Sequence, residues 1–317
     1  MVAMKPVEFL ADLEVKPARL RELADALPAV VWPVEPGARL LLTGMGSSWF
    51  AADTAARRLR RAGVQAVADL ASVEAGPPPD PSLTLVGISA SGGSKETLQF
   101  LEAHQGVSRT IGLTNTPDRA MPVEHTVQLL AGPEPGGVAC RSYLHTLILL
   151  LQLEHQLVGN LPGLADAVRR AADAADVLLN TRSEWLPAVQ HALDGPNGSW
   201  LLAPAERLGN ALQGALMLRE GPRRAADGCE TGDWNHVDVY LTKSLDYRAL
   251  LFTGSRFDAD ATQWMRERKS TFVAVGGHLR GAATEVRYPG DDDPLVALLT
   301  ESLVPELAAA ERWLHAG

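Results

Sequence analysis

Short apolar runs alternate along the chain with stretches whose apolar residues recur every three or four positions. The first pattern is typical of buried β-strands and the second of amphipathic helices. In the first half, two strand-like runs end in small-residue turns, at 44–48 and 89–94, and each turn leads into a helix-like stretch. We therefore expect strands at 39–43, 83–88, 109–113 and 125–130, and helices at 49–61, 95–104 and 138–158.

The same alternation returns after Asp194-Gly-Pro-Asn-Gly. Repeated alternation of strands and helices predicts βαβ units with parallel strands. The expected fold class is therefore α/β, with two parallel sheets that each carry helices on both faces. In this second half we expect strands at 199–203, 247–253 and 270–275, and helices at 206–220, 258–267 and 294–314.

These elements divide the chain into four expected segments. The most apolar stretch, at 147–157, contains Gln152, Glu154 and His155, so it predicts a buried helix and not a membrane span. We expect an N-terminal helical segment at 1–34, a first α/β domain at 35–160, a connecting helix at 161–194 and a second α/β domain at 195–317.

Composition and charge narrow the choice of ligands. The 317 residues carry a net charge of −9, which argues against a nucleic-acid partner, although a local dipole-lined pocket can still bind phosphate. Cys140 and Cys229 are the only two cysteines and form no metal-binding motif, so we expect no metal. The charged N-terminus lacks a signal core, which predicts a cytoplasmic, reduced protein. The turn Gly44-Met45-Gly46 lacks the third glycine of a dinucleotide site, so no organic cofactor is expected either.

The turn Ser89-Ala-Ser-Gly-Gly-Ser94 lies between an expected strand and an expected helix. The first N–H groups of a helix have no internal partners and the helix dipole is positive there, so such a turn can hold an anion. Ser89, Ser91 and Ser94 add hydroxyl donors. The alternative is that these serines only cap the helix. The position at the carboxyl end of a parallel strand favours a ligand, and no lysine follows as in a nucleotide P-loop.

Four segments together resemble the SIS (sugar isomerase) family, whose domains are flavodoxin-like parallel-sheet sandwiches. The similarity is greatest to the isomerase half of glucosamine-6-phosphate synthases and to ketosamine-phosphate deglycases. The segments are T-G-M-G-S-S-W-F-A-A from Thr43, I-S-A-S-G-G-S-K-E-T-L from Ile88, A-G-P-E-P-G-G-V-A-C-R-S-Y from Ala131 and A-L-Q-G-A-L-M-L-R-E from Ala211.

The resemblance implies a sugar-phosphate substrate, no cofactor and a role in the metabolism of carbohydrate derivatives. By this resemblance, Ser89, Ser91 and Ser94 hold the phosphate, and Ser48 contacts the sugar together with the backbone at Gly46, Ser47, Val138 and Ala139.

The resemblance also supplies a catalytic pair, Glu220 and His236. Glu220 matches the family's base, which moves a proton between adjacent carbons through an enediol, and its place at a helix C-terminus predicts a raised pKa. His236 matches the histidine that opens the sugar ring as acid and base. In the family this histidine belongs to the neighbouring subunit, which implies a homodimer with a shared active site.

The chain departs from the synthases at several places. Met217 replaces a lysine one turn before the glutamate, Cys140 replaces a serine or threonine, and no lysine-bearing tail follows His315. The sequence also has no N-terminal catalytic cysteine or glutaminase segment, so we expect a glutamine-independent protein. Three functions stay open: isomerisation of a sugar phosphate, deglycation or deamination of a ketosamine phosphate, and sugar-phosphate sensing without turnover.

Overall fold

The structure is a computed structural model that describes residues 4–315. The chain forms two compact units, each built on one five-stranded parallel sheet. The first-sheet unit comprises residues 21–133 and 139–166, and the second-sheet unit comprises residues 4–20, 134–138 and 167–315. The expected fold class, two parallel sheets with helices on both faces, is confirmed. We keep the domain boundaries at 35–160 and 195–317 as a proposal, one domain around each sheet.

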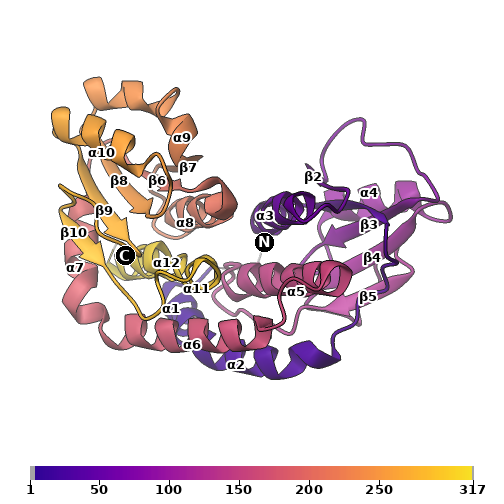
Figure 1. Ribbon diagram of the computed structural model, residues 1–317. Coiled ribbons are helices and arrows are strands. Elements are labelled where there is room, and N and C mark those ends of the chain that lie inside the picture. Colours follow the sequence, from indigo (N-terminus) through magenta and orange to yellow (C-terminus); the bar gives the residue numbers. More distant parts are fainter. Residues whose placement is uncertain (1–3, 316–317) are drawn as a thin grey trace. The chain divides into compact units, whose positions relative to one another are not determined.

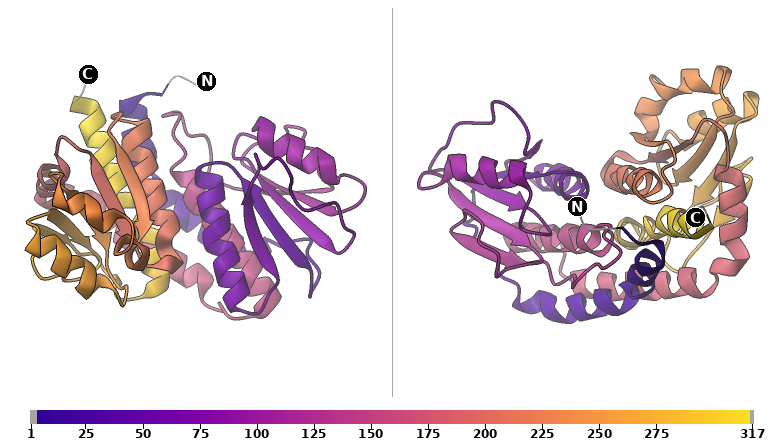
Figure 2. Two further views of the ribbon diagram at one scale, coloured as in Figure 1. Left: turned by 90° about the horizontal axis from the view of Figure 1, so that it is seen from above. Right: turned by 180° about the vertical axis from the view of Figure 1, so that it is seen from behind.

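The first-sheet unit has the strand order β2-β1-β3-β4-β5. Helices α3 and α5 pack against each other on one face of this sheet, and α4 covers the other face (Figures 1 and 2). Its elements are η1 (Leu27–Ala29), β1 (Arg39–Gly44), α3 (Ser47–Arg61), β2 (Ala66–Leu70), β3 (Leu83–Ile88), α4 (Lys95–His104), β4 (Arg109–Thr114), β5 (His125–Gln128) and α5 (Arg141–Val158).

The central strands of this sheet are buried along almost their whole length. Every residue of β3 is buried, and so are all but the first residues of β1 and β4. Helices on both faces require apolar side chains on both sides of a strand, which explains the continuous apolar runs in the sequence. On the α4 face, Leu41 and Leu85 pack with Phe100 and Leu101. A Cβ at Gly87 would lie 2.6 Å from Leu101, so a glycine lets α4 approach β3 closely.

The second-sheet unit has the strand order β10-β9-β8-β6-β7. Helix α8 packs on β6 and β7, and α12 packs on α8. Helices α2 (Lys16–Ala26) and α6 (Leu164–Asn180) each run from one unit into the other. The remaining elements are α1 (Pro6–Glu14), α7 (Arg182–Leu193), β6 (Ser199–Ala203), η2 (Ala205–Arg207), α8 (Leu208–Glu220), β7 (Ala226–Glu230), α9 (Thr231–Trp234), η3 (Asp238–Lys243), β8 (Arg248–Phe252), α10 (Asp258–Glu267), β9 (Thr271–Val275), β10 (Thr284–Val286), α11 (Pro294–Thr300) and α12 (Leu303–His315).

Both sheets have the same topology. Numbered from the first strand of each unit, the order is 2-1-3-4-5 in both, and all strand pairs are parallel. In such sheets the order in which successive strands are added reverses between the first and third strands, and ligands bind outside the carboxyl ends of those two strands. Ligand sites are therefore expected at the carboxyl ends of β1 and β3 in one unit and of β6 and β8 in the other.

Several elements differ from the sequence prediction. The helix expected over the connecting segment is two helices, α6 and α7, and the last helix is also two, α11 and α12. Three edge strands, β2, β7 and β10, were not expected, because they are only partly buried and their sequences lack a continuous apolar run, whereas the fourth edge strand, β5, was expected. No helix between residues 4 and 315 is long and apolar enough to cross a membrane.

Candidate functional site

Two turns lie side by side at the carboxyl edge of the first sheet. Gly44, the last residue of β1, pairs with Ile88, the last residue of β3. A Cβ at Gly44 would lie 2.8 Å from the Cβ of Ser48 and 3.0 Å from the carbonyl oxygen of Ile88. The turn at 44–48 and the loop at 89–94 are therefore neighbours, as expected for the switch point of this topology.

The loop 89–94 is braced from within. The backbone N–H of Gly92 donates to the carbonyl oxygen of Ser89 at 2.9 Å, and the N–H of Ser94 donates to the hydroxyl oxygen of Ser89 at 3.3 Å. Gly92 has φ +62°, and a Cβ there would come within 2.9 Å of the Oγ1 of Thr116. This turn therefore requires a glycine.

The three loop serines have different surroundings. Ser94 is the N-cap of α4, since its hydroxyl oxygen accepts from the N–H of Thr97 at 3.4 Å and its hydroxyl donates to Glu96 at 3.0 Å. Ser89 is buried and braces the loop. Ser91 is exposed, and within residues 4–315 its hydroxyl makes no hydrogen bond. Helix capping thus accounts for Ser94 but not for Ser91.

The neighbouring turn places a second helix N-terminus at the same edge. Gly46 is the N-cap of the fifteen-residue helix α3, with φ 53° and ψ −127° and no side-chain cap. Ser47 is buried and Ser48 is half-buried in the first turn of this helix. Because the dipole of a helix is positive at its N-terminus, α3 and α4 both favour an anion at this edge.

The third predicted segment, Val138-Ala139, falls where the chain passes from one unit to the other. Val138 is buried. The residues before it belong to the second-sheet unit, where the N–H of Gly136 donates to the Oδ2 of Asp12 at 2.9 Å. A Cβ at Gly136 would meet the backbone of Phe9, so helix α1 fixes this segment.

A cationic side chain that the sequence analysis did not single out lies against the phosphate-binding candidate. Arg119 follows β4, and its Nη1 donates to the carbonyl oxygen of Ser91 at 3.3 Å. Its guanidinium also covers Gly93. The sequence could have indicated this residue, because Arg119 ends the turn Asn115-Thr-Pro-Asp-Arg119 after β4. That turn lies at the carboxyl edge of the first sheet, where the loop 89–94 also lies.

Glu220 is the last residue of α8 and is half-buried. Burial raises the pKa of its carboxyl, while the positive charges of Arg223 and Arg219 act in the opposite direction. The direction agrees with the sequence prediction. Met217, which takes the place of the family's lysine, is fully buried.

His236 follows the short helix α9 and is exposed. It lines a cavity of about 670 Å³ together with acidic and aromatic side chains. Its backbone N–H donates to the carbonyl oxygen of Asp233 at 2.8 Å. Other residues of this cavity are Glu230, Phe257 and Trp264.

Glu220 and His236 lie at opposite ends of the second sheet. The backbone of Ala211 in α8 touches Gly228 of β7, and Glu220 lies nine residues further along the helix, about 14 Å away. Helix α8 runs back toward the amino ends of the strands, whereas His236 comes after the carboxyl end of β7. The structure therefore does not bring these two residues of one chain together.

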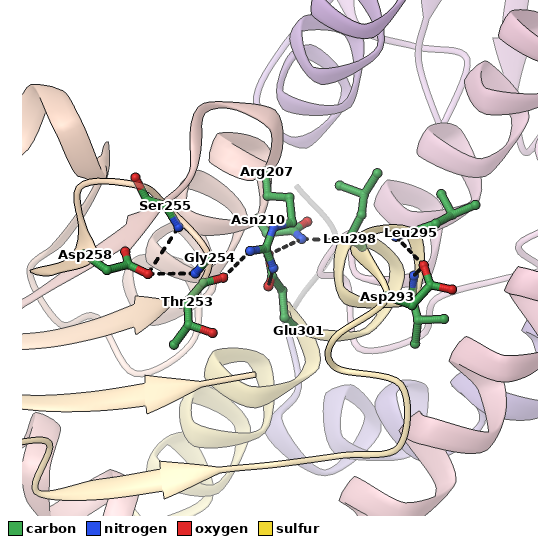
Figure 3. Close-up of polar contacts among 11 residues, drawn as sticks. Arg207, Asn210, Thr253, Gly254, Ser255, Asp258, Asp293, Leu295, Leu298 and Glu301 are labelled. Atoms are coloured by element: carbon green, nitrogen blue, oxygen red, sulfur yellow. Dashed lines mark hydrogen bonds and ion pairs between the residues drawn. The ribbon is translucent and has the colours of Figure 1, made fainter. Parts of the chain in front are cut away.

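The second sheet has its own loop at the equivalent place, and this loop is closed (Figure 3). Asp258 accepts hydrogen bonds with its Oδ2 from the N–H groups of Gly254 at 2.7 Å and Ser255 at 3.1 Å. Burial raises the pKa of the Asp258 carboxyl, and these two hydrogen bonds oppose the shift. A carboxylate of the chain itself thus lies where an anion would meet this loop.

A buried ion pair lies beside that closed loop. The guanidinium of Arg207 contacts the Glu301 carboxylate and the carbonyl oxygen of Thr253, and Asn210 donates to Glu301 at 2.9 Å (Figure 3). Burial raises the pKa of Glu301 to about 7 against the opposing influence of Arg207. Arg207 and Asn210 thus both hydrogen-bond with Glu301, and the guanidinium of Arg207 lies against the start of the second loop.

Solved structures with the same fold include several enzymes of sugar-phosphate metabolism. The C-terminal domain of glucosamine-fructose-6-phosphate aminotransferase from Francisella tularensis matches with a TM-score of 0.77 and 14% identity, covering 96% of both chains. Tagatose-6-phosphate ketose/aldose isomerase from Escherichia coli matches with a TM-score of 0.77 and 16% identity, covering 98% of this chain and 93% of that one. Glucosamine-6-phosphate deaminase from Thermotoga maritima matches with a TM-score of 0.74 and 15% identity, covering 98% and 95%. The chain therefore has the same fold as these three proteins.

Sequence relatives include fructose-6-phosphate aminotransferases, a name shared with the first of these structures. The chain is 27% identical over 265 residues to the isomerising glutamine–fructose-6-phosphate aminotransferase of Aeropyrum pernix, and 26% identical over 184 residues to that of Thermosynechococcus vestitus. These matches cover 75% and 52% of this chain but only 42% and 29% of the relatives. No protein-family profile matches the sequence. The resemblance to SIS proteins seen in the sequence is confirmed by these relatives and by the fold.

Proposed function

We propose that this protein binds a sugar phosphate, with the phosphate group on the loop 89–94. The observation that carries the proposal is the pair of neighbouring helix N-termini at the β1–β3 edge, together with the exposed residue Ser91 in the loop 89–94. Ser89 and Ser94 complete the phosphate site. The names of the sequence relatives, which act on fructose 6-phosphate, support this class of ligand.

We further propose that the protein converts its ligand by aldose–ketose isomerisation, or by deglycation or deamination of a ketosamine phosphate. Glu220 would remove a proton next to the carbonyl carbon and form the enediol, and its raised pKa suits a base that works near neutral pH. His236 would open the ring from a neighbouring subunit, as its distance from Glu220 within one chain requires. The sugar would lie against Ser48 and the backbone of Gly46, Ser47, Val138 and Ala139.

A second candidate is a sugar-phosphate sensor without turnover. The observation in its favour is Met217, a fully buried apolar side chain in the place of the family's lysine. A buried methionine can neither donate to a sugar hydroxyl nor carry a proton.

One experiment separates the two candidates. Binding of hexose and ketosamine phosphates is measured by calorimetry, and conversion by the change in reducing sugar or released amine. Glu220→Gln should leave binding within about twofold and lower turnover by roughly 10³-fold. Binding without any conversion by the unchanged protein would leave the sensor, and no binding of any phosphate would end both proposals.

The remaining properties follow from the same proposal. We propose a homodimer, a cytoplasmic location, and a reaction that takes no nitrogen from glutamine. Sedimentation should give about twice the chain mass, and a mixture of Glu220→Gln and His236→Ala proteins should recover activity through heterodimers. Glutamine added with the sugar phosphate should release no ammonia.

A further inference from the structure

Arg119 is held against the loop 89–94 by the backbone and not by an acidic residue. Its Nη1 donates to the carbonyl oxygen of Ser91 at 3.3 Å. Its backbone N–H donates to the carbonyl oxygen of Thr116 at 3.0 Å, which closes the turn that carries it. Throughout residues 4–315, no carboxylate forms an ion pair with this guanidinium.

The loop is shaped to receive this guanidinium. A Cβ on Gly93 would lie 2.6 Å from Cζ and from both terminal nitrogens of Arg119, and a Cβ on Gly92 would lie 3.3 Å from its Cδ. The planar group therefore lies flat over Gly93, where any other residue would push it away. Of its five N–H donors, one is used by the Ser91 carbonyl.

The other charged side chains next to the loop, Lys95 and Glu96, do not offer the paired N–H donors that Arg119 offers to a phosphate. Lys95 and Glu96 are exposed in the first turn of α4. The pKa of Glu96 is lowered by a hydrogen bond with its own backbone N–H and by the hydroxyl of Ser94, so Glu96 stays ionised. Arginine presents a flat fork of donors that matches phosphate oxygens, whereas lysine acts as a point charge.

We propose that Arg119 binds the phosphate group of the ligand at the loop 89–94. This inference rests on the proposed sugar-phosphate binding. It assigns to the turn after β4 a residue that contacts the same anion as the serines. Gly93 serves this contact by leaving room for the guanidinium.

The test is a titration of the full-length protein with glucose 6-phosphate, fructose 6-phosphate and inorganic phosphate. Arg119→Gln should weaken each affinity about three- to tenfold, and the loss should shrink in 0.5 M NaCl because exposed charges are screened there. Arg119→Lys should recover part of the loss. Arg39→Gln removes the same charge at the opposite end of the sheet and should change nothing, and Lys95→Gln should change affinity less than Arg119→Gln.

A double-mutant cycle with Gly93→Ala tests the contact itself. Gly93→Ala displaces the guanidinium and should weaken binding by about as much as Arg119→Gln, and the double variant should be no weaker than either single variant. Additive losses would show that Gly93 acts on the loop alone and would overturn the assignment. Equal effects of Lys95→Gln and Arg119→Gln would show that Arg119 acts only through its positive charge near the loop, and this result would also overturn the assignment. If the unchanged protein binds no phosphate, the proposed function falls as well, whereas normal binding by Arg119→Gln removes only the role of Arg119.

Discussion

The loops after β3 and β8 occupy equivalent places in two sheets of the same strand order, yet they satisfy their backbone amides differently. Ser94 is the sixth residue after β3 and caps α4 with a neutral hydroxyl. Asp258 is the sixth residue after β8, and its carboxylate accepts from two loop amides. One topology thus gives a loop without an internal carboxylate in the first unit and a loop filled by its own carboxylate in the second.

The turns after the first strand of each sheet also differ in the size and charge of an equivalent side chain. Ser48 is the fourth residue after β1, and Arg207 is the fourth residue after β6. Arg207 reaches across its loop to Glu301, whereas the small Ser48 leaves room. Two sheets of the same topology therefore differ at equivalent loops, because one carboxylate and one arginine fill the second loop.

The largest effect should come from closing the first loop. Ser94→Asp should weaken sugar-phosphate binding about 100-fold or more, because a carboxylate within roughly 4 Å repels a phosphate by several kcal/mol. The fold should persist, since aspartate is a good N-cap. Calorimetric titration measures the loss, and Ser94→Asn provides the uncharged control. Comparable affinities for the Asp and Asn variants would break the comparison between the two loops.

The ion pair of the second loop should make stability depend on pH. Burial raises the pKa of Glu301 in the folded protein to about 7, above the ordinary value of 4.5 for a glutamate, so the stability that Glu301 contributes falls as pH rises between these values. The change is up to about 3 kcal/mol. Denaturant titrations at pH 5 and pH 8 should show that Glu301→Gln lacks this part of the pH dependence.

Glu96 in the first loop supplies the matched control. Its pKa is lowered, so its contribution to stability is present above the unfolded pKa and is lost only as pH falls below it. Glu96→Gln should therefore leave the difference between pH 5 and pH 8 unchanged. If the free energy of unfolding changes equally between pH 5 and pH 8 in the Glu301→Gln protein and in the unchanged protein, Glu301 is not the source of the pH dependence.

A smaller loss of stability is expected when the second loop is opened. Asp258→Ala should lower the free energy of unfolding by about 1–2 kcal/mol, because the N–H groups of Gly254 and Ser255 lose their acceptor. Asp260→Ala, at an exposed site on the same helix, should cost less than about 0.5 kcal/mol. Equal costs at the two positions would mean that the carboxylate of Asp258 does not hold the loop together.

A loss of stability of similar size should come from a change in the backbone of the first loop. Gly92→Ala should cost about 1–2 kcal/mol in thermal or denaturant unfolding, because φ is +62° and the new Cβ meets Thr116. Gly106 also has positive φ, but a Cβ there would meet nothing within 4 Å, so Gly106→Ala isolates the backbone cost. A cost at Gly92 that does not exceed the cost at Gly106 would show that the contact with Thr116 is unimportant.

Much of the fold could be predicted from the sequence, and the reason lies in burial. Strands β1, β3, β4, β6, β8 and β9 are buried by helices on both faces, so their sequences are continuous apolar runs. The edge strands β2, β7 and β10 are half-solvated and carry no such run, so they were missed. The breaks at Thr181 and near Glu301 were missed because the apolar pattern continues across them.

The two α/β halves, the SIS resemblance and the serine loop could be recognised in the sequence alone, because they depend on residues that are close together in the chain. Only the tertiary structure decided which groups meet at the ends of the strands. It placed Arg119 on Gly93, filled the second loop with Asp258 and Arg207, and separated Glu220 from His236 along α8. Each of these depends on which strand ends are neighbours in a sheet or on the direction in which a helix runs, and local patterns of hydrophobic and polar residues do not carry that information.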